Sequence, residues 1–341
     1  MVRNACLTPQ PPMSDDAVTR RSLLAGTAAT AVLALGAIVR TTPVMAQPGT
    51  IEVVATTAMI GDAVRQVSGG RAKVSVLMGE GVDPHSYRQT RSDVVAMTRA
   101  DAVFWHGLNL EAQLVGFLSD LGRRKPVAAL GERVPREKLL DDPAAPGRPD
   151  PHIWMDPRLW REVVNATRDE LTKLDPAGRP TFEANAARHL DEVDRLAAYA
   201  ERALATVPQG ARALVTAHDA FNYFGRAYGF EVVGIQGIST DSEAGLKQIE
   251  DIVKLLIERR IRSVFVESSV SDRSVRALIE GAAARGHTVE VGGELFSDAM
   301  GRPGTYEGTY VGMIDHNVTV ITRALGGDTG KAGLNGRLAA N

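Results

Sequence analysis

The tripeptide Asp-Pro-His occurs twice in the sequence, at residues 83–85 within DPHSY and at residues 150–152 within DPHIW, although the chain has only seven histidines. Proline fixes its own φ angle and disfavours a helical conformation at the preceding residue, so each tripeptide presents an imidazole from a stiff, non-helical segment. Imidazole nitrogen is a common ligand of divalent transition metals. The repeat therefore suggests His85 and His152 as members of a metal site, with chance repetition as the alternative.

A third histidine and two carboxylates occupy comparable positions. His218 comes two residues after a predicted strand at 213–216, Glu267 ends the predicted strand SVFV, and Asp298 lies in the loop ELFSDAMG after another predicted strand. In open α/β sheets ligands bind at the carboxyl ends of the strands. A hydrogen-bonded or helix-capping role is the alternative for each carboxylate. Asp298 lies in the better-placed loop for a ligand.

The other four histidines are weaker candidates. His106 ends a predicted strand in VFWHGL, and His189 is expected to face solvent among the Arg and Asp residues of a predicted helix. His287 and His316 are expected to be structural.

Three neutral imidazoles and one carboxylate suit a divalent first-row cation. Zn²⁺ fits this set, and Mn²⁺ or iron is tolerated if the carboxylate binds through both oxygens. The ring N–H groups of such ligands need hydrogen-bond acceptors. Asp83, Asp150 and Asp219 are candidates because each is close in sequence to one of the three histidines.

Hydrophobic periodicity predicts an alternation of strands and helices that positions these loops. The predicted strands cover residues 51–56, 73–77, 102–105, 126–129, 213–216, 231–235, 263–266 and 288–291. The predicted helices cover residues 60–67, 92–99, 110–121, 157–173, 180–206, 220–228, 242–259, 272–285 and 305–325. Short connections between alternating elements indicate parallel βαβ units.

The two halves of the chain share a layout, in which a strand and a Thr lead into a helix, in VVATTAMIGDAV and again in LVTAHDAFNYF. The helix at 180–206 is free of Gly and Pro in its interior, and about 40 Å of helix at 1.5 Å per residue is more than one small lobe needs. The sequence therefore predicts an α/β protein of two similar lobes with parallel sheets, with this helix as a spine and one site in the cleft between the lobes.

The N-terminal residues have the pattern of an export signal. Arg20-Arg21 precedes a weakly apolar run that ends in a small-residue cleavage pattern at Ala46, which resembles a twin-arginine signal. The single cysteine, Cys6, falls inside this segment, so no disulfide and no cysteine lipid anchor are expected after cleavage. We expect a soluble, exported periplasmic protein.

Charge and composition exclude one class of partner and set the domain plan. The net charge of −2 and the interspersed charges do not indicate nucleic-acid binding. We predict an export signal at 1–46, an N-terminal lobe at 47–178, a linking helix at 179–207, a C-terminal lobe at 208–326 and a disordered tail at 327–341.

Five stretches, in order, resemble the TroA type of solute-binding protein of zinc and manganese ABC importers, along nearly all of the mature chain. They are LMGEGVDPHSY, DPHIWMDPRLW, VTAHDAFNYFGRAYGFEVVGIQGIST, VFVESSV and GGELFSDAMGRPGTYEGTYVGM. The resemblance implies two α/β lobes joined by one rigid helix, with the metal in the cleft and little hinge bending. It implies His85, His152, His218 and Asp298 as ligands, with Glu267 beside them rather than on the metal.

The resemblance also implies a function and partners. We expect a monomeric, non-enzymatic component that captures Zn²⁺ or Mn²⁺ as transported cargo and delivers it to an ABC permease and its ATPase subunit. Zinc is favoured because it outbinds manganese at most nitrogen sites. The chain departs from strict zinc scavengers, which often carry a His-rich loop between the first two ligands, and from manganese-selective members, which often have Glu where this chain has His218.

Two other functions fit parts of the pattern. Three His ligands with an open coordination position would activate water in a zinc hydrolase, but the sequence has no HExxH motif and no clear general base. A metal-free pair of lobes can bind a larger chelate such as haem or cobalamin, but such relatives lack the ordered histidines.

Overall fold

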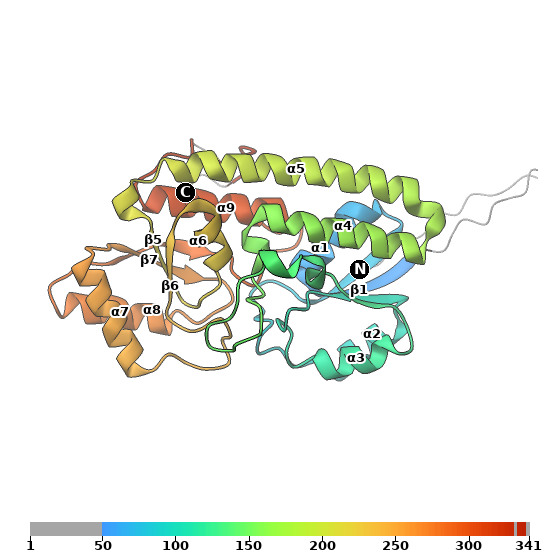
Figure 1. Ribbon diagram of the computed structural model, residues 1–341, viewed down its shortest axis with the longest axis horizontal. Helices are drawn as coiled ribbons and strands as arrows, with labels where there is room; N and C mark the ends of the chain where they lie inside the picture. The colour runs from blue at the N-terminus through green and yellow to red at the C-terminus, as the bar shows by residue number, and fades with distance from the viewer. Residues whose placement is uncertain (1–49, 331–332, 339–341) are drawn as a thin grey trace, which may run out of the picture. The chain divides into compact units, whose positions relative to one another are not determined.

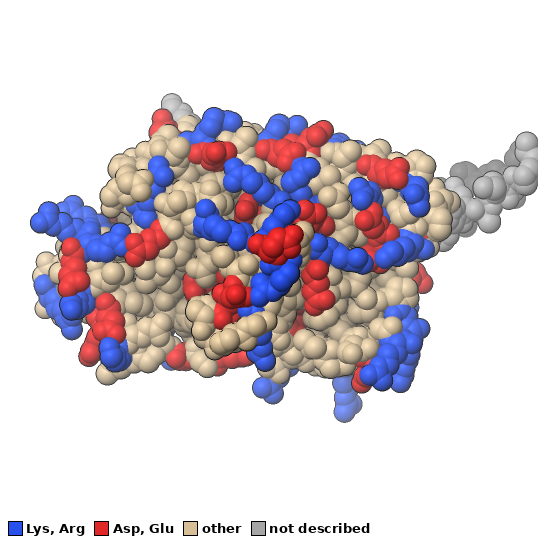
Figure 2. Space-filling view, in the orientation of Figure 1, with Lys and Arg blue, Asp and Glu red and all other residues tan. Residues whose placement is uncertain are grey.

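The computed structural model describes residues 50–330 and 333–338, so the predicted export signal at 1–46 lies outside the described residues. Among the described helices, none is both long enough and apolar enough to cross a membrane. Positive and negative side chains are interspersed over the face shown in Figure 2.

The N-terminal lobe is built on a parallel four-stranded sheet with the strand order β2-β1-β3-β4. Its strands are β1 (Ile51–Thr57), β2 (Ala72–Met78), β3 (Ala102–Trp105) and β4 (Val127–Ala129). Neighbouring residues of β1 point to opposite faces, as a strand requires. Val53 and Ala55 belong to the hydrophobic core that lies beneath the helices at 157–174 and 179–205. Val54 belongs to a second core, with Met97 and Leu118.

Four helices belong to this lobe, and local capping explains where three of them begin. They are α1 (Ala58–Ser68), α2 (Arg91–Arg99), α3 (Val115–Gly122) and α4 (Pro157–Leu174). The Thr57 side chain caps α1, Thr90 and Asp93 form a capping box on α2, and Asp156 caps α4 just before Pro157. Helices α2 and α3 lie on the far side of the sheet from α4 and from the long helix α5 (Arg179–Ala205) (Figure 1).

The C-terminal lobe contains two parallel strand pairs. Strand β5 (Ala213–Thr216) pairs with β6 (Glu231–Gly234), and β7 (Ser263–Glu267) pairs with β8 (Glu290–Leu295). The helices are α6 (Asn222–Tyr228), α7 (Leu246–Glu258), α8 (Arg273–Ala283) and α9 (Tyr310–Ala324).

The strands of this lobe also have two buried faces, as in the first lobe. Val215 and Val264 pack with residues of α7 and α8, whereas Leu214 and Phe265 pack with residues of α5 and α9. The predicted α/β fold with parallel sheets is therefore the observed one.

Helix α5 (Arg179–Ala205) runs above both lobes, over α4 at one end and α9 at the other (Figure 1). The hydrophobic core beneath it is one continuous cluster, which includes Phe104 from the first lobe and Leu214 and Tyr310 from the second. His189 of α5 is buried within this arrangement, so the expectation that it faces solvent was wrong. Helix periodicity alone does not reveal that α1 and α9 pack against α5 in addition to α4.

Several predicted segments differ from the structure. The helices predicted at 110–121 and 242–259 begin later, at Val115 and Leu246, and the strand predicted at 288–291 is observed at Glu290–Leu295. Helix α9 begins at Tyr310 rather than 305, because Thr309 caps it by accepting a hydrogen bond from Gly312 N. The tail after 326 was predicted to be disordered, yet its described residues make defined contacts. Leu334 N donates to Asp315 Oδ1 at 2.8 Å, and Asn335 Nδ2 donates to Tyr306 Oη at 2.9 Å.

Candidate metal centre

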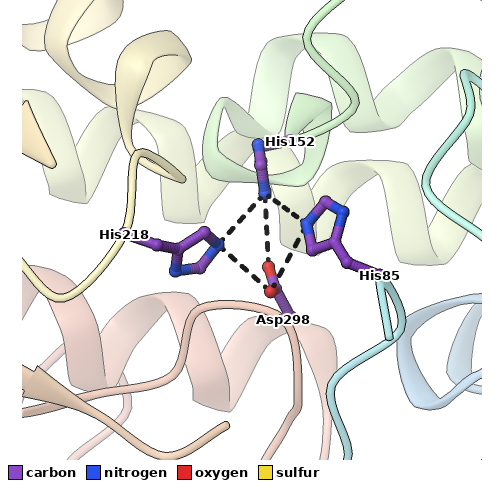
Figure 3. A group of neighbouring side chains, drawn as sticks. All are labelled: His85, His152, His218 and Asp298. Atoms are coloured by element: carbon purple, nitrogen blue, oxygen red, sulfur yellow. Dashed lines mark hydrogen bonds and ion pairs between the residues drawn. The ribbon is translucent and has the colours of Figure 1, made fainter. Parts of the chain in front are cut away.

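Four loops bring His85, His152, His218 and Asp298 together (Figure 3). His85 follows β2, His218 follows β5 and Asp298 follows β8, each beyond the carboxyl end of its strand, while His152 lies in the loop before α4. All four side chains are buried, with exposed fractions of 3% or less. The N-terminal lobe supplies two of these residues and the C-terminal lobe supplies the other two.

The facing atoms lie at the separations expected of ligands to one small ion. His152 Nε2 is 3.3 Å from His85 Nε2 and 3.4 Å from His218 Nε2. Asp298 Oδ2 is 3.1 Å from His218 Nε2, and Asp298 Oδ1 is 3.4 Å from His152 Nε2. Zinc–nitrogen bonds of about 2.0–2.1 Å in a tetrahedron place neighbouring ligand atoms roughly 3.3–3.4 Å apart. The residues present therefore fit a transition-metal ion.

Asp298 presents both carboxylate oxygens to this centre. Both are fully buried, and neither accepts a hydrogen bond of good geometry from any residue that the structure describes. A buried carboxylate without such partners is costly unless a cation compensates it. The pair of free oxygens is therefore suited to metal coordination through one oxygen or both.

Two further carboxylates orient two of the imidazoles. Asp150 Oδ1 accepts from His152 Nδ1 at 2.7 Å, and Glu267 Oε2 accepts from His218 Nδ1 at 2.5 Å. Each carboxylate also accepts the backbone N–H of the same histidine at 2.9 Å. A proton held on Nδ1 leaves Nε2 free as a ligand atom and fixes the direction in which the ring points.

The other two predicted acceptors do not reach an imidazole. Asp83 Oδ1 accepts from the backbone N–H of His85 at 2.9 Å, and its side chain bonds to no ring nitrogen among the described residues. Asp219 interacts with Asn222, and burial raises the pKa of its carboxyl. Closeness in sequence was an insufficient guide, because a residue next to a histidine need not face its ring.

The charges of the site depend on burial and on the carboxylates. Burial lowers the pKa of His85 to about 4, although Asp298 opposes this shift. Burial also lowers the pKa of His152, but Asp150 and Asp298 outweigh it and raise that pKa to about 9. Burial raises the pKa of Asp298, but His218 and His152 outweigh it and hold the pKa well below its usual range. Without metal, protons on the imidazoles supply the positive charge that Asp298 requires.

One hydrogen bond ties a ligand loop of one lobe to a ligand loop of the other. Trp154 Nε1, two residues after His152, donates to the carbonyl of Ser297 at 2.8 Å, and Ser297 precedes Asp298. Tyr310 Oη of α9 donates to the Trp154 carbonyl at 2.9 Å. The two loops are therefore fixed relative to each other without metal contacts.

Three further residues support His152; from the sequence, His106 was named only as a weaker ligand candidate, and Asn222 and Tyr223 were not named as site residues. His106 Nε2 lies 2.8 Å from the carbonyl of Pro151, so this histidine supports the loop and is not among the four converging side chains. Asn222 Nδ2 donates to Asp150 Oδ2 at 3.1 Å, and Tyr223 Oη donates to the Asp150 carbonyl at 2.7 Å. Asn222 and Tyr223 both lie in the stretch HDAFNYF, which begins at His218. Their closeness in sequence to a candidate ligand was the signal that could have identified them.

Comparisons with known proteins agree with this architecture. The model of the family described as "Zinc-uptake complex component A periplasmic" matches residues 53–324. The chain is 45% identical to the manganese-binding lipoprotein MntA of Bacillus subtilis over 276 residues, which are 81% of this chain and 90% of that protein. It is 43% identical to the zinc-binding protein TroA of Treponema pallidum over 273 residues, which are 80% of this chain and 88% of TroA.

Solved structures are similar as well. The structure of the periplasmic zinc-binding protein TroA from Treponema pallidum superposes with a TM-score of 0.79 at 42% identity, covering 81% of this chain and 99% of that one. The structure of Fe(III)-bound YtgA from Chlamydia trachomatis gives a TM-score of 0.74 at 30% identity, with coverage of 82% and 99%.

Proposed function

The chain belongs to the family of periplasmic zinc-uptake components, and from this we propose that it captures one transition-metal ion with His85, His152, His218 and Asp298. It is a metal-binding, substrate-binding component of an ABC importer, and the ion is its cargo. The observation that carries the ligand assignment is the convergence of these four buried side chains, whose ligand atoms lie within 4.8 Å of one another.

Zinc is the cargo that we propose first. Relatives with similar sequences are named for manganese in one case and for zinc in the other, so the names do not decide the question. At sites rich in nitrogen ligands Zn²⁺ binds more tightly than Mn²⁺. Manganese or iron is accommodated if both oxygens of Asp298 coordinate, and the orientation of both oxygens toward the imidazoles supports this second mode.

We propose that the ion sits between two lobes, at 47–178 and 208–326, joined by the spine helix at 179–207. His85 and His152 come from the first lobe, and His218 and Asp298 from the second, so neither lobe alone completes the site. The shared core beneath α5 and the Trp154–Ser297 hydrogen bond support a small closing motion rather than a wide hinge.

The partners that we propose are an ABC permease and its ATPase subunit, which accept the ion from a monomeric binding protein. Residues 1–46 are proposed to direct export through a twin-arginine route, with cleavage near Ala46, leaving a soluble periplasmic protein without a lipid anchor. The periplasmic description of the family supports the compartment.

The geometry does not favour the two alternatives. Four ligands supplied by the protein leave no open coordination position for an activated water, which a zinc hydrolase requires. A haem or cobalamin chelate needs a large apolar cleft, whereas the ligand atoms of the four side chains here lie within 4.8 Å of one another. We therefore propose a binding protein rather than an enzyme.

The test is a competition titration of the metal-stripped protein with Zn²⁺ and Mn²⁺ against a chelator of known affinity. We expect tight binding of one Zn²⁺ and weaker binding of Mn²⁺. The variants His85→Ala and Asp298→Ala should each lose affinity by orders of magnitude. His316→Gln is the matched control, since His316 bonds to the Glu294 carbonyl away from the site. Unchanged affinity in both ligand variants would refute the assignment.

A further inference from the structure

His85 is held differently from the other two imidazoles. Asp150 and Glu267 accept from the Nδ1 atoms of His152 and His218, but Nδ1 of His85 has no hydrogen-bond partner within the described part of the chain. Its ring direction therefore depends on the backbone of its own loop. That loop, residues 79–90, connects β2 to α2.

Asp83 fixes the conformation of this loop by accepting three hydrogen bonds. Its Oδ1 accepts from His85 N at 2.9 Å, and its Oδ2 accepts from Ser86 Oγ at 2.8 Å. The third donor is Thr240 Oγ1, at 2.6 Å from Oδ2. A hydroxyl that donates to a carboxylate at this distance makes a charge-assisted hydrogen bond, which is stronger than a neutral one.

Thr240 comes from the opposite lobe. It lies in the loop between β6 and α7 and is separated from Asp83 by 157 positions. The same N-terminal loop approaches the C-terminal lobe at a second point. Gly81 has a φ of +70°, and a Cβ placed there would lie 3.5 Å from the carbonyl oxygen of Ser268. The loop that carries His85 is thus bonded to one segment of the C-terminal lobe, at Thr240, and lies close to a second, at Ser268.

We propose that Thr240 is a positioning residue for His85, which it holds through Asp83 across the gap between the lobes. This inference rests on the proposed function, since it takes His85 as a metal ligand. With the Thr240–Asp83 bond made, His85 is directed at the ion. When the lobes separate, this bond breaks and His85, which has no carboxylate on its ring, is the first ligand to leave. The bond therefore sets how fast bound metal is released.

The proposal predicts a change in the rate of metal release and not in the rate of metal binding. Thr240→Val keeps the shape of the side chain and removes the donor, so metal enters as before but escapes faster. We expect the rate of Zn²⁺ release to rise about tenfold and the association rate to change less than twofold. Thr240→Ser keeps the hydroxyl and should restore slow release. Both variants should melt like the unaltered protein when metal-free, because Thr240 is only partly buried.

The experiment measures Zn²⁺ release from the loaded protein by mixing it rapidly with an excess of a chromogenic chelator, and association by the reverse mixing. Ser239→Ala is the matched control, since among the described residues the neighbouring hydroxyl accepts only from Asp241 N, in its own loop. Ser86→Ala removes a donor to the same Asp83 oxygen from within the loop and should accelerate release less than Thr240→Val.

The outcomes separate the two proposals. If the unaltered protein binds no Zn²⁺, the proposed function fails. If it binds Zn²⁺ but Thr240→Val releases it no faster than Ser239→Ala does, the positioning role fails and the ligand set stands. If Thr240→Ser releases Zn²⁺ as fast as Thr240→Val, the effect is not due to the hydroxyl and the proposal is also overturned.

Discussion

Glu267, at the end of β7, accepts two hydrogen bonds from His218 of the loop after β5, one from ring Nδ1 at 2.5 Å and one from the backbone N–H at 2.9 Å. One carboxylate thus fixes both the loop conformation and the direction of the ring. The two residues are 49 positions apart and belong to different strand pairs, so only the packing of β5 beside β7 brings them together.

The variant Glu267→Gln should weaken Zn²⁺ binding by about 10- to 100-fold, the usual effect of losing such a hydrogen-bond acceptor. The amide oxygen of Gln accepts at most one of the two hydrogen bonds from His218. In addition, a neutral amide in place of the carboxylate makes the imidazole of His218 a weaker base. A chelator competition titration measures the change. Glu294→Gln, at an exposed position on β8, should leave the affinity unaltered. Equal affinities for the two variants would contradict the orienting role of Glu267.

Metal should stabilise the folded protein, because the complete site is absent from the unfolded chain. At a free Zn²⁺ concentration a hundredfold above Kd, linkage contributes about 2.7 kcal/mol, which for a folded chain of this size corresponds to a rise in Tm of roughly 4–5 °C. Thermal unfolding followed by circular dichroism, with and without chelator, measures the shift. Asp298→Asn should melt at nearly the same temperature in both conditions. If metal raised the Tm of Asp298→Asn as much as that of the unaltered protein, the stabilising ion would bind at a site that does not include Asp298.

Glu111 should be important for stability although it does not face the metal. It is fully buried and accepts from Thr56 Oγ1 at 2.6 Å, His106 N at 2.8 Å and Gly107 N at 3.1 Å. Leaving a buried donor unpaired costs about 1–3 kcal/mol.

Glu111→Leu should therefore lower the free energy of unfolding by at least about 3 kcal/mol, and Glu111→Gln should lower it less. Denaturant unfolding of the metal-free protein measures both. Glu132→Leu, at an exposed position in a neighbouring turn, serves as the control. A loss below 1 kcal/mol for Glu111→Leu would show that the three donors find other partners.

Substitution by alanine should have opposite effects on the stability of the protein at two glycines that lie in helices. A Cβ at Gly312, in the first turn of α9, would lie 1.8 Å from the Tyr306 carbonyl oxygen, whereas a Cβ at Gly116 of α3 meets no atom within 4 Å. Gly312→Ala should displace the turn before α9 and destabilise the protein by more than about 2 kcal/mol. Gly116→Ala should stabilise it by about 0.5–1 kcal/mol.

Thermal and denaturant unfolding of these two variants, both free of metal, measure the difference. Because each change adds the same methyl group to a helix, the pair isolates the effect of the surrounding space. A stable Gly312→Ala variant would mean that the 302–309 turn repacks readily.

The sequence by itself determined the elements and the residue types of the site. Strand and helix periodicity is a local property, and so is the rigid presentation of an imidazole after Asp-Pro. These patterns sufficed to predict parallel α/β lobes, the helix observed at Arg179–Ala205, and His85, His152, His218 and Asp298 as candidates. Each of the four could be identified as a candidate because it lies in a loop, in most cases at the end of a strand. Such a position can be recognised from the neighbouring residues.

Only the tertiary structure decided which groups act on these side chains. Asp83, Asp150 and Asp219 were equivalent by sequence proximity, yet only Asp150 bonds to an imidazole, while Glu267 reaches His218 from another strand. The burial of His189 and the Thr240–Asp83 bond likewise depend on segments far apart in the chain. Side-chain direction at such contacts follows from how helices and sheets pack, and local patterns carry no information about that packing.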